Sequence, residues 1–132
     1  MSNIRVRGWH SVQKRMYSPE ELAADQLTLL PTGEFINVSG MSTKLSTIFP
    51  VDKFVPLLST GTTDIDKKEV FQDDIVSFQT RNGDTTFIGK VIWLPEVAGF
   101  VVDSEHNYFG AIHYIHNLKV IGNVRENPEL LE

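Results

Sequence analysis

The sequence predicts a mostly β protein with a minor α component, folded as small curved antiparallel sheets. Short runs of β-branched and aromatic residues, several of them alternating apolar with polar, recur through the 132 residues. Turn-forming Gly, Pro, Asn and Asp separate these runs at close spacing. Gly89 stands inside the longest run, residues 85–93, where it predicts a bulge or bend. Because bends let a short sheet curl and close, the C-terminal part is predicted to be an SH3-like barrel.

The N-terminal part, residues 1–58, is predicted to be a β subdomain with one short helix. Ser18, Pro19 and the two carboxylates that follow are a typical helix start, and the helix is expected to last about two turns. Pro56 cannot donate a ladder hydrogen bond, so its segment is expected to be an edge strand or a strand entry. A polar loop is expected over residues 39–53. The expected strands are residues 4–9, 15–17, 27–30, 35–38 and 54–58.

The C-terminal part, residues 59–132, is predicted to hold the barrel and a short tail. Residues 59–64 form a turn-rich connector that marks the candidate boundary. Asn82 and Gly83 are the strongest hairpin signal in the chain. The tail from residue 124 is expected to be a turn or short helical end. The expected strands are residues 75–78, 85–93, 100–102, 108–112 and 119–121.

Composition narrows the function classes. Seventeen Asp and Glu against twelve Lys and Arg leave a net charge of −5, which works against binding to phosphates. The absence of cysteine excludes disulfides, thiolate zinc sites and cysteine nucleophiles, and suits a cytoplasmic protein. No apolar run approaches the roughly twenty residues that span a bilayer, so no membrane association is expected. The first residues lack the apolar core of a signal peptide.

No arrangement of side chains predicts catalysis, a cofactor or a metal site. His113 and His116 are three residues apart, and on a strand such residues point to opposite faces. The glycines form no phosphate-binding series. Asp74 is expected to accept backbone N–H groups at a turn. The remaining acidic candidates lack calcium-loop spacing and are Asp64, Asp66, Asp73 and Asp103. We therefore expect no catalytic residue, no cofactor and no metal, and a protein that is not an enzyme.

Several segments, in order along the chain, resemble the YopX family of phage and prophage proteins. The C-terminal segments are the most specific match, and Gly8, His10 and Asp73 stand where the family usually has alanine, aspartate and glycine. The resemblance implies a mostly β fold with a YopX-like barrel, self-association, and a phage-derived origin in a bacterial host, with no activity assigned. The matching segments are residues 4–9, 14–17, 60–67, 69–76, 120–124 and 126–131.

These observations lead to two main hypotheses of function, and a small metal-dependent enzyme that uses His113 and His116 is ranked last. The first is a non-enzymatic accessory protein of phage or prophage origin that acts through self-association and contacts with host or phage proteins. Its physical basis is the expected edge strand at residues 54–58, since unpaired edges are covered by pairing with another subunit. The alternative is a nucleic-acid-associated module, in which a basic and aromatic cluster near the N-terminus makes the contact. That cluster is Arg5, Arg7, Trp9, Lys14 and Arg15.

Overall fold

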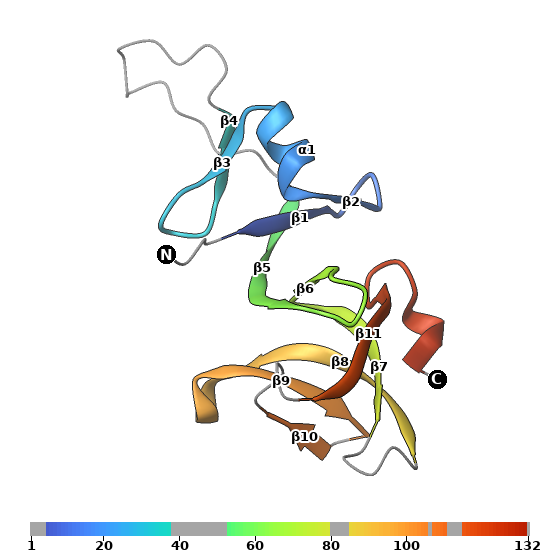
Figure 1. Ribbon diagram of the computed structural model, residues 1–132. Coiled ribbons are helices and arrows are strands. Elements are labelled where there is room, and N and C mark those ends of the chain that lie inside the picture. The colour runs from blue at the N-terminus through green and yellow to red at the C-terminus, as the bar shows by residue number, and fades with distance from the viewer. Residues whose placement is uncertain (1–4, 38–52, 80–84, 106, 111–114, 132) are drawn as a thin grey trace. The chain divides into compact units, whose positions relative to one another are not determined.

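The computed structural model describes residues 5–37, 53–79, 85–105, 107–110 and 115–131. The chain divides into two compact units, Arg5–Leu57 and a second unit that begins at Leu58. Antiparallel strands dominate both units, and helix is a minor component (Figure 1). The predicted fold class is therefore confirmed.

The described residues of the N-terminal unit include two short hairpins and one helix. β1 and β2 pair antiparallel, with Gly8 opposite Tyr17, and β3 pairs with β4, with Leu29 opposite Phe35. β5 begins in this unit, where it neighbours β1. The strands are β1 Val6–His10, β2 Arg15–Tyr17, β3 Leu27–Leu29, β4 Phe35–Asn37 and β5 Phe54–Thr63.

The helix α1, Pro19–Ala24, begins where the sequence predicted, because its first turn is capped in both directions. The Ser18 hydroxyl accepts the Glu21 N–H at 3.1 Å, and the Glu21 carboxylate accepts the Ser18 N–H at 3.0 Å. Leu22 is the buried residue of the helix and packs with Tyr17 and Phe35. Six residues are too few to form a stable helix alone, so the cap and this burial hold α1 in place.

The second unit is a five-stranded antiparallel sheet in the order β10-β9-β8-β7-β11, curled into a half-barrel (Figure 1). β5 continues into this unit and pairs there with β6. The buried core is mainly aliphatic, with Phe78 at one end against Phe87 and Phe109. The elements are β6 Glu69–Phe71, β7 Asp74–Gln79, β8 Thr86–Leu94, β9 Gly99–Ser104, β10 Asn107–Phe109, β11 His116–Asn123 and the 3₁₀ helices η2 Pro95–Val97 and η4 Pro128–Leu131.

One expectation about the segment after residue 53 is wrong. β5 runs to Thr63, so the expected turn-rich connector at residues 59–64 is almost wholly strand. β5 lies between β1 and β6 in the sheet order, but its register with β6 begins at Ser59, so the edge strand or strand entry expected at residues 54–58 stays a prediction. Gly61 has a φ of +81°, and the pairing with β6 shifts register between Ser59 and Thr63. Such an irregularity lets glycine and polar residues continue a strand.

Gly89 serves close packing and makes no bulge. The register of β8 is continuous on both sides, against β7 and against β9. A Cβ at Gly89 would lie 2.6 Å from the Asp103 carbonyl oxygen and 2.7 Å from Val102 Cγ1. The register shifts in the sheet occur in β11, between His116 and Lys119 and between Val120 and Gly122. Glycine here allows the neighbouring strand to approach closely.

Some predicted features lie outside the described residues. They are most of the loop at 39–53, all of the turn at 81–84, the end of the strand at 108–112, and His113.

Candidate functional site

The N-terminal basic residues lie against acidic residues of α1. Arg5 Nη2 is 2.7 Å from Glu20 Oε1, and Arg15 forms an ion pair with Glu21. The Arg15 guanidinium also lies 4.1 Å from the centre of the Tyr17 ring. The hydrogen bond from Arg5 lowers the pKa of Glu20 below its ordinary value. Two of the cations proposed for nucleic-acid contact therefore have internal carboxylate partners.

The other members of this cluster do not complete an exposed patch. Trp9 is 6 % exposed and Arg7 9 % exposed, because both lie on β1, which is buried over its central residues. Trp9 therefore offers little surface for stacking in this structure, and its contact with nucleic acid stays an untested prediction. Lys14 is exposed in the turn between β1 and β2. The structure does not gather the five residues into one accessible surface.

Asp64 ties the turn after β5 to the last strand of the sheet. Its Oδ1 accepts the N–H groups of Asp66 and Lys68 at 2.9 Å each, and its Oδ2 accepts the N–H of Val120 at 2.9 Å. The neighbouring Ile65 N–H donates to the Leu118 carbonyl at 2.9 Å. These bonds cover part of the outer edge of β11, a strand at one end of the sheet order.

The electrostatics of Asp64 follow from those bonds. Burial alone raises the pKa of the carboxyl, but the N–H groups of Val120, Lys68 and Asp66, with the Lys68 charge, outweigh it. The pKa of Asp64 therefore lies below its ordinary value, and the group is ionised at neutral pH. A carboxylate that accepts three backbone N–H groups stabilises the fold at this point.

Asp74 and Asp73 have structural partners as well. The buried Asp74 carboxylate accepts the Phe71 N–H at 2.8 Å, which confirms the predicted turn cap. Asp73 has a φ of +71°, a conformation that glycine adopts more easily. Its side chain lies 3.1 Å from Arg125 Nε. The aspartate at this position thus adds an ion pair to a left-handed turn.

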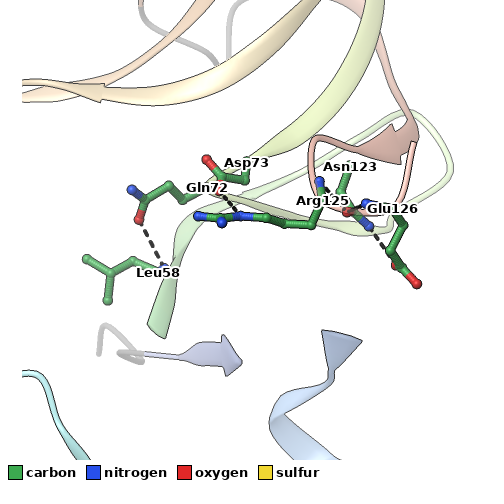
Figure 2. A network of polar contacts seen from close by, with 6 residues as sticks. All are labelled: Leu58, Gln72, Asp73, Asn123, Arg125 and Glu126. Carbon is green, nitrogen blue, oxygen red and sulfur yellow. Dashed lines mark hydrogen bonds and ion pairs between the residues drawn. The ribbon is translucent and has the colours of Figure 1, made fainter. Parts of the chain in front are cut away.

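Residues 123–131 follow β11 and form a compact structure that we call the C-terminal clamp (Figure 2 shows its first half). Asn123 Oδ1 accepts the N–H groups of Arg125 and Glu126 at 3.0 and 2.8 Å. Asn123 Nδ2 donates to Glu126 Oε1 at 2.8 Å. On the other side, the Arg125–Asp73 pair and the Val124 N–H bond to the Asp73 carbonyl join the clamp to the turn before β7.

The second half of the clamp turns back toward the sheet. Asn127 Oδ1 accepts the Asn123 N–H at 3.2 Å, and the Asn127 carbonyl accepts the Leu130 N–H at 3.1 Å. A Cβ at Gly122 would lie 2.7 Å from Asn127 Oδ1 and 2.9 Å from Leu130 Cδ1. The absence of a side chain at Gly122 therefore lets the clamp pack closely on β11. The most specific part of the YopX resemblance is the part that builds this clamp.

The clamp forms one wall of an open groove of about 450 Å³ on the second unit, which we call the β8 groove. Its lining combines two leucines of η4 with residues of β8, of β9 and of the turn after β9. Ile88 is 44 % exposed and Leu131 40 % exposed. The lining residues are Thr86, Phe87, Ile88, Lys90, Asp103, Ser104, Glu105, Leu130 and Leu131. Sequence reasoning missed this groove, because its walls come from segments that only the folded chain brings together.

Among the residues that the structure describes, no three His, Asp or Glu side chains gather as candidate metal ligands. His116 is exposed at the start of β11. Within the same residues, no helix is both long and apolar enough to cross a bilayer.

Comparisons with known proteins agree with one another. The model of the YopX protein family matches residues 5–132. Two crystal structures are similar over 100 % of this chain and of theirs: protein EF1440 from Enterococcus faecalis, at 21 % identity and a TM-score of 0.65, and protein yopX from Bacillus subtilis, at 19 % identity and 0.63. At these identities the likeness shows a shared fold and nothing further. No curated protein matches the chain.

Proposed function

The chain belongs to the YopX family, and from that premise we propose that it is a non-enzymatic accessory protein that acts through self-association and protein contacts. We place its origin in a phage or prophage and its action in the cytoplasm of a bacterial host. The proposal rests on the surface of the second unit, where apolar side chains stand exposed. It does not rest on the edge expected at residues 54–58, since β5 as a whole lies between β1 and β6 in the sheet order.

The observation that carries the proposal is an aromatic surface at the hairpin between β8 and β9. We call Trp93, Val97 and Phe100 the hairpin surface. Trp93 is 47 % exposed and Val97 59 % exposed. The Trp93 and Phe100 rings pack edge to face, with centroids 5.2 Å apart, and Phe100 packs on the buried core. Phe100 thus links the exposed Trp93 ring to the buried core.

A tryptophan held in this way suits a protein interface. Exposed aromatic residues are enriched where proteins meet, and a side chain already ordered loses little entropy on binding. The carboxylates add support, because Asp64 and Asp74 are engaged by backbone N–H groups. That engagement favours a binding role over acid–base chemistry.

Light scattering coupled to size-exclusion chromatography at micromolar concentration tests the proposal. We expect a mass above that of one chain, and a shift toward the monomer in Trp93→Ser and Val97→Ser. Val12→Ser is the matched control, since Val12 is 66 % exposed in the other unit. A wild-type chain that stays monomeric across the concentration range would refute self-association. Equal effects of Val97→Ser and Val12→Ser would refute the hairpin surface as the contact.

A further inference from the structure

The β8 groove has the character of a binding site for part of another protein. Its volume of about 450 Å³ is large enough for one or two side chains, and it is open to solvent along one side. Ile88 and Leu131 expose apolar surface into the space between β8 and η4. Exposed aliphatic residues on facing walls gain free energy when an apolar side chain lies between them.

The groove is held in shape by the C-terminal clamp. η4 ends the clamp, and its Leu130 N–H donates to the Asn127 carbonyl, while the Asn127 side chain accepts the Asn123 N–H. Gly122 lets Leu130 approach β11 closely. The leucine wall is therefore fixed by hydrogen bonds to the end of β11. A preformed groove loses less entropy on binding than a flexible tail does.

The charges at the groove favour a partner that carries a basic side chain. Lys90 lies directly opposite Asp103 on the neighbouring strand, so their charges offset one another. Glu105, exposed in the turn after β9, adds a negative charge beyond that pair. The whole chain is also acidic, with a net charge of −5. A basic side chain is therefore attracted to this groove by the local excess of negative charge at Glu105, and also by the long-range electrostatic field of the acidic chain.

We propose that the β8 groove binds a peptide segment of a partner protein in which a basic residue adjoins apolar residues. The apolar side chain lies between Ile88 and Leu131, and the basic group lies near Glu105. This inference builds on the proposed role in protein contacts and gives that role a second surface, apart from the hairpin surface. Its failure would leave the light-scattering result untouched.

Fluorescence anisotropy with three labelled synthetic peptides tests the proposal on the full chain at physiological salt. One peptide alternates leucine and lysine, a second replaces the lysines by glutamate, and a third replaces the leucines by serine. We expect the leucine–lysine peptide to bind at least about ten-fold more tightly than either of the others. Absence of binding, or equal binding of the glutamate peptide, would overturn the proposal.

Matched variants separate this groove from general charge attraction. Glu105→Lys and Glu96→Lys change the net charge equally, but Glu96 lies in η2 and does not line the groove. We expect Glu105→Lys to weaken the binding of the leucine–lysine peptide about five-fold more than Glu96→Lys does. Equal losses would mean that the whole-chain field attracts the peptide, and the assigned groove would be wrong.

A second set of variants tests the walls. Leu131→Ser should weaken the binding of the same peptide about ten-fold, whereas Val12→Ser should leave the binding unchanged. Asn127→Ala should also weaken it, whereas Asn127→Asp keeps the oxygen that accepts the Asn123 N–H and should retain binding. If Leu131→Ser instead changes the mass of the assembly while the peptide does not bind, the groove is a contact between copies of this chain and the proposed partner is wrong.

Discussion

Replacement of Asp64 by asparagine removes a hydrogen bond that joins the turn after β5 to β11. The carboxylate accepts three backbone N–H groups, those of Asp66, Lys68 and Val120, each at 2.9 Å. An asparagine side chain has one oxygen, so at least one of these N–H groups faces an amide N–H₂ instead of an acceptor. Val120 is buried, and an N–H group left there without an acceptor costs about 1–3 kcal/mol.

We therefore expect Asp64→Asn to lower the free energy of unfolding by about 2 kcal/mol at neutral pH. For a chain of this length, that corresponds to a fall of about 8 °C in the melting temperature. Urea denaturation and thermal melts measure both quantities. Asp66→Asn is the control, because it removes the same charge two residues away and Asp66 contributes only its backbone N–H to Asp64. It should change stability by less than about 0.5 kcal/mol.

The pH dependence gives a second, independent test. The pKa of Asp64 is lower in the folded chain than its ordinary value, so its contribution is fully present above the unfolded pKa, which is about 4. That contribution is lost as the pH falls through the folded pKa. The difference between wild type and Asp64→Asn should therefore shrink in acid. Equal effects of Asp64→Asn and Asp66→Asn, or a difference that stays constant with pH, would refute the assigned role of Asp64.

Three further predictions follow from the packing, the helix cap and the ion pairs. Gly89→Ala should cost at least about 3 kcal/mol, since its Cβ would lie 2.6 Å from a backbone oxygen, whereas Gly99→Ala meets its nearest atom at 3.7 Å and should be nearly neutral in urea denaturation. Ser18→Ala should cost about 1 kcal/mol in the same assay through loss of the helix cap, with Ser11→Ala as the control. In a gel-shift titration, DNA and RNA should not bind at low salt, because two N-terminal arginines already face carboxylates of α1. Binding that weakens with added salt would restore the alternative hypothesis.

Features that depend on neighbouring residues were predictable. Ser18 and Glu21 cap a helix across three residues, and the hairpin of β3 and β4 follows from Gly33 and the apolar residues on either side. The turn cap of Asp74 likewise reaches only to Phe71. In each case the residues that determine the structure are close in the chain, so the pattern of residue types contains the necessary information.

Features that depend on distant residues were mispredicted or missed. Polar composition at residues 59–64 suggested a turn, yet β5 continues through most of them because β6 pairs with it. Gly89 suggested a bulge or bend, yet the register with β7 shows no bulge there, and the absence of a side chain is needed because Asp103 on the next strand lies close. The burial of Trp9, which lies near basic residues in the sequence, likewise depends on how the central residues of β1 pack in the fold. Propensity describes a residue in isolation, and tertiary pairing overrides it.

The sequence by itself determined that the chain is mostly β and that a capped helix begins after Ser18, because periodicity and local hydrogen bonding depend on residues close together in the chain. The YopX family was suggested by the resemblance of several segments and is shown by the family model. Only the tertiary structure decided which polar groups meet. Asp64 reaches Val120 across 56 residues, and the groove unites Ile88 with Leu131. Contacts of that separation depend on how the sheet curls, and the curl arises from the packing of whole strands against one another.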